Sequence, residues 1–236
     1  MGQILYQLND EDLAFPSPEL ALNDPNGLLA VGGDLSAERL LQAYLNGIFP
    51  WYSQGDPILW WSPNPRAIIE ITNLKINRTL QKVINRGNFT ITINQDFKNI
   101  IKNCANAPFR TGGTWIVNDI QQAYIRLHQL GYAHSVEVWQ NNELAGGLYG
   151  VAINGYFCGE SMYYQQPNAS KLALVGLAQH LAQLDIEFID CQLLNPFLAA
   201  MGAIEISRRD FIKRMKNQLK IKCPDNFWQT KIIKSK

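Results

Sequence analysis

The stretch HSVEVWQNNELAGGLYGVAINGYFCGESMYYQQPNASKLALVGLAQHLAQLDIEFIDCQ, residues 134–192, decides the fold. Apolar and polar side chains alternate over residues 135–139, and the apolar segments 144–153 and 156–160 continue the pattern. Alternation with a period of two is typical of β-strands. The Asn-Gly dipeptide between the last two segments favours a tight hairpin turn. We therefore expect three consecutive strands here.

A helix and a fourth strand complete this unit. Leucines and alanines recur at helical spacing over residues 169–184, and Asn168 is placed to cap the helix. Residues 187–192 then form a short strand. Because a strand-helix-strand connection is usually right-handed and parallel, Glu160 and Asp190 are expected near the carboxyl ends of neighbouring strands. The pattern β-β-β-α-β predicts a ligand site at that edge.

The whole chain of 236 residues is predicted to be an α+β protein with two unequal domains. Residues 1–64 are dense in turn-forming and aromatic residues around one short apolar strand and a helix at 37–46, capped by Asp34 or Ser36. Residues 65–236 carry the larger domain. Its further expected elements are strands at 66–72 and 89–93 and helices at 75–86, 96–105 and 118–130.

Composition is that of an ordinary globular protein, with 47% hydrophobic residues and a net charge of +1. Basic residues are concentrated after residue 207, which predicts either a solvated helix face or a polyanion-binding tail. No leader and no apolar run approaching the ~20 residues of a membrane span is found, so we expect a soluble cytoplasmic protein. The four cysteines and three histidines show no metal-ligand spacing, and no metal site is predicted.

Three tryptophans, Trp51, Trp60 and Trp61, lie within eleven residues. They indicate a small aromatic core, with base stacking from a rigid loop as the alternative. Farther along, Arg78, Lys82 and Arg86 are spaced four apart on a predicted helix, which aligns three cations on one face. That face is either solvated or a track for nucleic-acid phosphates.

Several short motifs occur in order along nearly the whole chain and together resemble leucyl/phenylalanyl-tRNA–protein transferases. They are Phe15-Pro16-Ser17-Pro18, Pro25-Asn26-Gly27-Leu28-Leu29-Ala30, Gly33-Asp34-Leu35-Ser36, Gly47-Ile48-Phe49-Pro50-Trp51, Trp60-Trp61-Ser62-Pro63, Gly113-Thr114-Trp115-Ile116, His134-Ser135-Val136-Glu137-Val138-Trp139, Gly159-Glu160-Ser161-Met162, Asn168-Ala169-Ser170-Lys171 and Asp190-Cys191-Gln192. The resemblance implies a small N-terminal domain and a catalytic domain with an acetyltransferase-like (GNAT-type) mixed α/β fold.

The reaction that this resemblance implies is transfer of leucine or phenylalanine, and less well methionine, from aminoacyl-tRNA to the N-terminal α-amine of a protein that begins with Arg or Lys. The product is marked for degradation. An aminoacyl ester is already activated, so no cofactor, ATP or metal is expected; the amine must lose a proton and be held in line with the carbonyl.

The resemblance also implies roles for individual residues. Trp51 and Trp115, with Tyr124 adding to the wall, would hold the terminal adenosine of the tRNA. The aminoacyl side chain would enter an apolar pocket formed by Leu148, Phe157, Met162 and Ile189. From their spacing on one helix face, Arg78, Lys82 and Arg86 are the candidates for contacts with tRNA phosphates.

Asp190 and Gln192 are alternate residues of one predicted strand, so their side chains are expected on one face, with Cys191 on the other. By resemblance, Asp190 accepts hydrogen bonds from Gln192 and from the attacking amine, either as a general base or as an orienting group. Glu160 would position neighbouring groups. These three are the predicted catalytic residues.

Two other functions are compatible with the same elements. A coenzyme-A-dependent acetyltransferase should carry a glycine-rich turn at the helix start, where amides bind pyrophosphate, but residues 167–171 are Pro-Asn-Ala-Ser-Lys. The second alternative is an RNA-binding module without catalysis, built on the aromatics and the basic tail.

Overall fold

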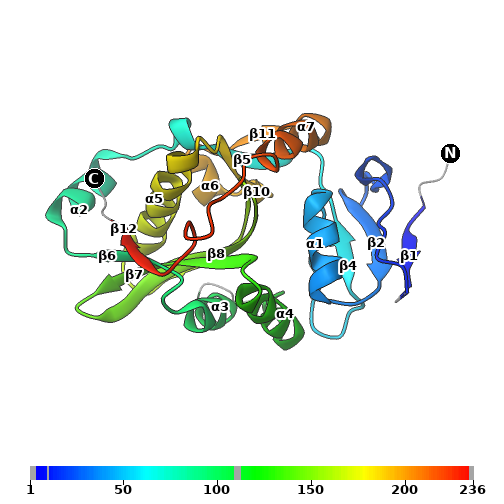
Figure 1. Cartoon of the computed structure of the whole chain (residues 1–236), viewed down its shortest axis with the longest axis horizontal. Coiled ribbons are helices and arrows are strands. Elements are labelled where there is room, and N and C mark those ends of the chain that lie inside the picture. Colours follow the sequence, from blue (N-terminus) through cyan, green and yellow to red (C-terminus); the bar gives the residue numbers. More distant parts are fainter. Residues whose placement is uncertain (1–3, 10, 109–112, 234–236) are drawn as a thin grey trace.

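The computed structural model describes residues 4–9, 11–108 and 113–233 (Figure 1). Two sheets divide these residues in chain order. The first has the strand order β1-β2-β4-β3, and the second has the order β11-β5-β10-β9-β8-β7-β6-β12. The first sheet ends at Trp61 and the second begins at Arg66. The mixed α/β class predicted from the sequence is confirmed, and one small sheet precedes one large sheet.

The first sheet is built from four short strands with one helix on it. Its elements are β1 (Tyr6–Leu8), β2 (Leu28–Gly32), α1 (Ala37–Leu45), β3 (Phe49–Pro50) and β4 (Leu59–Trp61), with a 3₁₀ turn at Pro18–Leu20. Ser36, one of the two expected caps, accepts a hydrogen bond from the Arg39 amide at 3.3 Å. Gly47 has a φ of +71°, which lets the chain reverse directly after α1.

The central unit of the second sheet matches the predicted β-β-β-α-β order. It consists of β7 (Ala133–Gln140), β8 (Glu143–Ile153), β9 (Tyr156–Tyr164), α5 (Ala169–Leu181) with a 3₁₀ turn at Ala182–Leu184, and β10 (Phe188–Gln192). Strands β9 and β10 are parallel neighbours, with Asp190 opposite Cys158. The parallel crossover is therefore confirmed.

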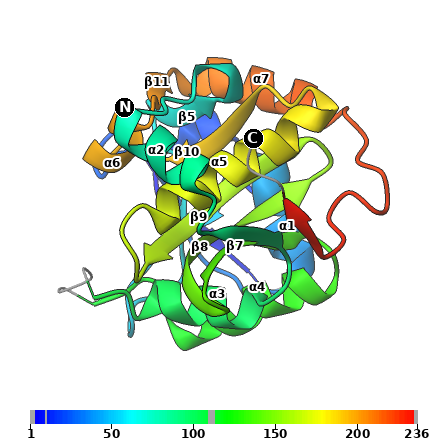
Figure 2. The ribbon, with the colours of Figure 1, turned by 90° about the vertical axis from the view of Figure 1, so that its left-hand side faces the viewer.

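The remaining elements extend this sheet on both sides and cover its faces. They are β5 (Arg66–Glu70), a 3₁₀ turn at Ile71–Asn73, α2 (Arg78–Arg86), β6 (Thr90–Ile93), α3 (Phe97–Ala105), α4 (Asn118–Gln129), α6 (Pro196–Ala200), β11 (Ile204–Ile206), α7 (Arg208–Gln218) and β12 (Lys231–Ile233). Helix α5 packs on one face of β7 and β8, and α3 and α4 pack on the other (Figure 2). Both faces are covered, so β8 is buried along nearly its whole length.

Three local predictions are corrected. Asn168 precedes α5, but its side chain makes no capping hydrogen bond and its φ is +70°. Helix α2 starts at Arg78 rather than residue 75, because Asn77 caps it by accepting from the Leu80 amide at 2.9 Å. Glu160 does not end its strand, since β9 continues to Tyr164. Within the described residues, no helix is both long enough and apolar enough to cross a bilayer.

Candidate active site

Two strand irregularities mark the point where β9 and β10 meet. In β9, Ser161 pairs with Tyr149 and Gly159 pairs with Gly150, so Glu160 is an extra residue in the ladder. In β10, Asp190 pairs with Ile68 and Gln192 with Ala67, so Cys191 is likewise extra. Such β-bulges re-aim side chains and occur often beside active sites.

The bulge in β9 also explains a glycine on the neighbouring strand. A Cβ at Gly150 would lie 2.3 Å from the Cys158 carbonyl oxygen and 2.5 Å from the Phe157 ring. No larger residue fits there without moving the backbone of β9. Strands β8 and β9 are thus closely packed directly before the bulge that carries Glu160.

A pocket of about 670 Å³ opens at this point. Phe49, Pro50 and Trp51 line it from the first sheet, and Trp115 lines it from the loop before α4. Apolar residues of β8, β9, β10, α5 and α6 form the rest of the wall. They include the four predicted side-chain contacts Leu148, Phe157, Met162 and Ile189, together with Leu174, Leu177, Phe197 and Leu198.

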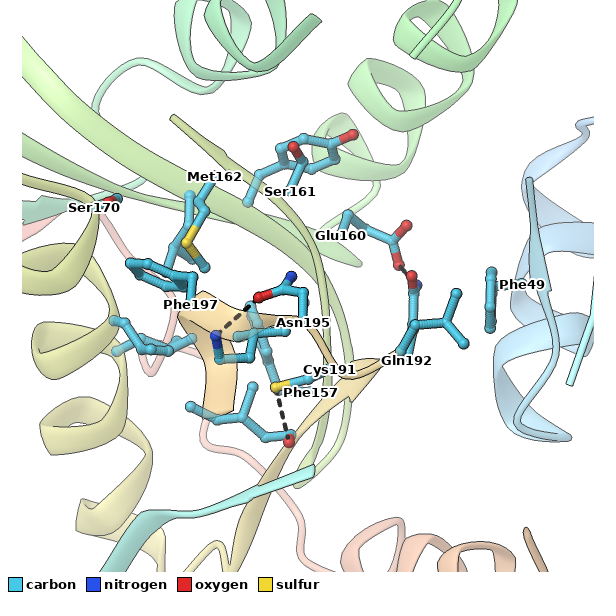
Figure 3. Close-up of a pocket in the computed structure, with 18 of the residues that line it drawn as sticks. Phe49, Phe157, Glu160, Ser161, Met162, Ser170, Cys191, Gln192, Asn195 and Phe197 are labelled. Carbon is cyan, nitrogen blue, oxygen red and sulfur yellow. Dashed lines mark hydrogen bonds between the residues drawn. The ribbon is translucent and has the colours of Figure 1, made fainter. Parts of the chain in front are cut away.

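The polar end of the pocket is an acid–amide pair. The Gln192 side-chain Nε2 donates a hydrogen bond to Glu160 Oε1 at 3.0 Å (Figure 3). Phe49 faces Gln192 from the first sheet, while Met162 and Phe197 lie on the opposite side of the pocket. Glu160 and Gln192 line the same cavity as Trp51 and Trp115. The site therefore brings an apolar chamber and a carboxyl group together.

Two buried tyrosines complete the hydrogen bonds of Glu160. The Tyr44 hydroxyl, from α1, donates to Oε1 at 2.7 Å, and the Tyr124 hydroxyl, from α4, lies 3.3 Å from Oε2. The two hydroxyls also contact each other. Both side chains are fully buried, and burial raises their pKa values well above the ordinary tyrosine value. They are thus neutral donors to the carboxylate.

Burial raises the pKa of Glu160 to about 7. Hydrogen bonds from Tyr44 and Gln192 oppose this shift by favouring the ionised form, but they do not cancel it. Glu160 is therefore divided between its acid and its carboxylate near neutral pH, which is the property of a group that exchanges protons at that pH.

Asp190 lies behind the pocket wall instead of in it. Its side chain is fully buried, and Arg66 binds it through two hydrogen bonds, Nε to Oδ1 at 2.8 Å and Nη2 to Oδ2 at 2.7 Å. The Tyr156 hydroxyl donates to Oδ2 at 2.6 Å. Burial alone would raise the Asp190 pKa, but the Arg66 guanidinium outweighs it and holds that pKa below the ordinary value. Arg66 thus favours the ionised form of Asp190.

The predicted alternation of Asp190, Cys191 and Gln192 is wrong. Cys191 lines the pocket beside Gln192, whereas Asp190 does not. Gln192 has a φ of +62°, and its backbone amide, not its side chain, donates to Asp190 Oδ1 at 3.0 Å. The bulge breaks the two-residue period and turns the Gln192 side chain toward Glu160. Alternation alone could not reveal this, because a bulge carries no strong sequence signal.

Other predicted residues fall into three groups. Trp51, which is 40% exposed, and Trp115 line the pocket, as expected for a stacking site. Tyr124 is fully buried behind Glu160, so in this structure its ring is not part of the wall. Arg78, Lys82 and Arg86 are exposed on α2, outside the pocket lining. In the described part of the chain, no three potential metal ligands cluster.

Sequence reasoning missed Tyr44, Arg66, Tyr156 and Phe49. Arg66 had a usable signal: it opens the apolar segment Arg66–Glu70, and a cation that enters a buried strand requires a buried acid as partner. Tyr44 lies on the apolar face of α1, so the sequence pattern predicts a residue of the hydrophobic core. Nothing in that pattern identifies Glu160 as its partner.

The chain matches the model of the leucyl/phenylalanyl-tRNA protein transferase N-terminal domain over residues 33–64, and that of leucyl/phenylalanyl-tRNA protein transferase over residues 68–216. A leucyl/phenylalanyl-tRNA–protein transferase of Colwellia psychrerythraea is 61% identical over 238 residues, which cover 99% of each chain. One from an Enterobacter species is 51% identical over 95% of each chain.

Similar solved structures include an acetyl transferase from Salmonella typhimurium, at 22% identity and a TM-score of 0.33 over 48% of this chain and 77% of that one. A GCN5-related N-acetyltransferase-like protein from Streptococcus suis matches at 14% identity and a TM-score of 0.35 over 68% of this chain and 60% of that one.

The sequence matches define the class of protein as an aminoacyltransferase, an enzyme that moves an aminoacyl group from tRNA to protein. In particular, the chain belongs to the leucyl/phenylalanyl-tRNA–protein transferase family.

The raised pKa of Glu160 predicts a pH-dependent stability difference. The folded protein keeps the Glu160 proton up to about pH 7, whereas the unfolded chain loses it near the ordinary value of 4.5. Between these values the folded state binds more protons, so its stability falls as pH rises. Relative to Glu160→Gln, the wild-type melting temperature should therefore fall from pH 5 to pH 8. Thermal unfolding of both proteins tests this, and a difference independent of pH would contradict it.

Proposed function

We propose that this protein transfers leucine or phenylalanine, and less well methionine, from aminoacyl-tRNA to the N-terminal α-amine of proteins that begin with Arg or Lys. One observation carries the proposal: two tryptophans, an apolar chamber and an acid–amide pair line the same pocket. The tryptophans suit the terminal base of the donor, the apolar chamber suits its aminoacyl side chain, and the acid–amide pair suits the acceptor amine.

The donor fits the pocket in two parts. Trp51 and Trp115 offer ring faces for the terminal adenosine, and stacking contributes about 1–3 kcal/mol per base. The aminoacyl side chain then enters the chamber of Leu148, Phe157 and Met162, which is apolar. Such a chamber accepts Leu and Phe and rejects charged side chains. It discriminates only modestly against Met, because apolar pockets separate apolar side chains of similar size weakly.

The acceptor amine is placed at the acid–amide pair. A protein α-amine has a pKa near 8 and that of Glu160 is about 7, so a proton passes between them at little cost. Glu160 takes one proton from the ammonium group, and the free amine attacks the ester carbonyl. As the C–N bond forms and the C–O bond to the ribose breaks, a second amine proton goes to the ribose oxygen. Gln192 orients the amine throughout.

In this scheme Asp190 is an orienting group and not the general base. Arg66 donates to both of its oxygens and holds its pKa below the ordinary value, which leaves it unsuited to take a proton from the amine. We assign it to orienting Gln192. The reaction requires neither nucleotide nor metal, since the aminoacyl ester is the activated species.

Selection of an Arg or Lys acceptor is assigned through the family, and the carboxylate of Glu160 offers electrostatic attraction to a cationic N-terminal segment. The modified protein is then a substrate for degradation. The place of the reaction is the cytoplasm, where aminoacyl-tRNA is formed and used.

The tRNA body is assigned to α2. Arg78, Lys82 and Arg86 are exposed along this helix, and none of them forms an ion pair with another residue that the structure describes. Phosphate contacts of this kind carry no sequence information, so one protein can accept several tRNAs.

The transfer itself is tested with labelled Leu-tRNA and a peptide that begins with Arg. We expect labelled peptide with the wild type, and none when the peptide N-terminus is acetylated, because the acceptor is the α-amine. Gln192→Ala should slow transfer at saturating donor while leaving donor affinity nearly unchanged. Donor binding without any transfer by the wild type would instead favour an RNA-binding module.

Trp51→Ala should lower affinity for an aminoacylated adenosine by roughly fivefold to a hundredfold, the loss of one stacking ring. The matched control is Tyr132→Ala, which removes another exposed aromatic ring outside the pocket lining. Affinity is measured by titration, after circular dichroism has shown that both variants fold. Unchanged affinity in Trp51→Ala would return Trp51 to a structural role.

Lys82→Glu should weaken binding of every tRNA about equally and reduce the salt dependence of binding, because fewer counterions are released. Lys98→Glu, the same change at an exposed lysine of α3, is the control. Binding is measured across a series of salt concentrations. Equal effects of the two substitutions would place the tRNA body elsewhere.

A further inference from the structure

Arg66 occupies an unusual position, fully buried at the first residue of β5. Its guanidinium donates to both oxygens of Asp190 and, through Nη1, to the backbone carbonyl of Gly47 at 3.2 Å. It also lies over the Phe49 ring at 4.8 Å and over the Phe211 ring at 4.5 Å. One side chain thus contacts both the strand that carries the acid–amide site and the segment after α1.

The contact with Asp190 acts on Gln192. The Asp190 Oδ1 atom that accepts from Arg66 also accepts from the Gln192 backbone amide. That bond closes the turn in which Gln192 has a φ of +62°, a conformation that costs free energy for a residue other than glycine. In this turn the Gln192 side chain reaches Glu160, with Nε2 3.0 Å from Oε1.

The contact with Gly47 acts on the other end of the pocket. Gly47 lies two residues before Phe49 and four before Trp51, and Phe49, Pro50 and Trp51 form the wall contributed by the first sheet. A Cβ at Gly47 would lie 2.9 Å from the Phe211 ring, so the backbone is closely held at this point. The guanidinium fixes where this segment leaves α1.

We propose that Arg66 is a positioning residue that anchors the segment 47–51 and the segment 190–192 together, and so sets the distance between the tryptophan end of the pocket and the acid–amide pair. Its kinetic consequence rests on the transfer function proposed above. The structural link that Arg66 makes between the two segments does not depend on that function. Sensitivity of transfer to this distance follows from the geometry of the reaction, in which the ester and the amine must meet within bonding reach.

The test removes both charges but keeps the acceptor for the Gln192 amide. Arg66→Met combined with Asp190→Asn leaves no unpaired buried charge, and the asparagine Oδ1 can still accept from Gln192. We expect this folded double variant to show faster amide hydrogen exchange in both segments. Transfer at saturating donor should fall at least about tenfold, and affinity for phenylalanyl-adenosine should fall severalfold.

Arg66→Lys is the second variant. It keeps the positive charge that folding needs, but a single ammonium group cannot reproduce the planar fork that binds Asp190 and Gly47 together. We expect the same two segments to loosen, to a smaller extent than in the double variant. This variant decides the matter if the double variant does not fold.

Arg39→Met is the matched control, because Arg39 is equally buried in α1 but has other partners, the backbone oxygens of Asn9 and Asp12 and, at 3.4 Å, the Asp34 carboxylate. It should leave exchange at 190–192 and the transfer rate unchanged. If a folded Arg66 variant has parental exchange in both segments and a parental rate, the proposal is wrong. If the wild type transfers nothing, the transfer function fails, while hydrogen exchange still decides whether the anchor exists.

Discussion

An ion pair without access to water, Arg66 with Asp190, is the constraint on which the rest of the site depends. Burying two charges costs several kcal/mol each, so such a pair persists only when its geometry satisfies nearly every donor and acceptor. Here Tyr156, Gly47 and the Gln192 amide supply the remaining partners. Loss of one member typically costs about 3–5 kcal/mol, against a total stability of about 5–15 kcal/mol for a protein of ordinary stability. The pair therefore joins fold and site in one network.

The same network separates two carboxylates into different roles. Asp190 is stabilised as an anion by Arg66, whereas the hydrogen-bond donors Tyr44, Tyr124 and Gln192 beside Glu160 are neutral. Burial alone would raise both pKa values, but the Arg66 cation brings that of Asp190 below its ordinary value, whereas the Asp190 anion adds to the rise at Glu160. Tyr44 comes from the first sheet unit and Tyr124 from the second. The electrostatics of Glu160 consequently depend on how the two units pack.

Much of the fold could be predicted from the sequence, because it depends on local patterns. The segment 134–192 carries regular alternation, a hairpin dipeptide and a helical period, and all of its elements are found. The pocket residues Leu148, Phe157, Met162 and Ile189 also lie together, since neighbouring strands and a crossover helix leave little choice. What failed was the orientation of residues 190–192 and the place of Tyr124. The bulge at Cys191 depends on pairing with Ala67 and Ile68, which are far away in the sequence. The partner of a buried tyrosine likewise depends on tertiary packing and not on the local pattern.

The extra residue in β9 has a consequence for how this chain tolerates changes in length. Glu160 faces the pocket because the ladder holds one residue more than its partner β8 between Gly159 and Ser161. Deleting a single residue there would restore a regular ladder, and the sheet would gain pairing as the acid left its place. The strand would be better formed, but the transfer reaction proposed above would lose its proton acceptor. The site therefore depends on the number of residues between the Gly159–Gly150 and Ser161–Tyr149 pairs as much as on which residues they are. Insertions or deletions here should be less tolerated than substitutions.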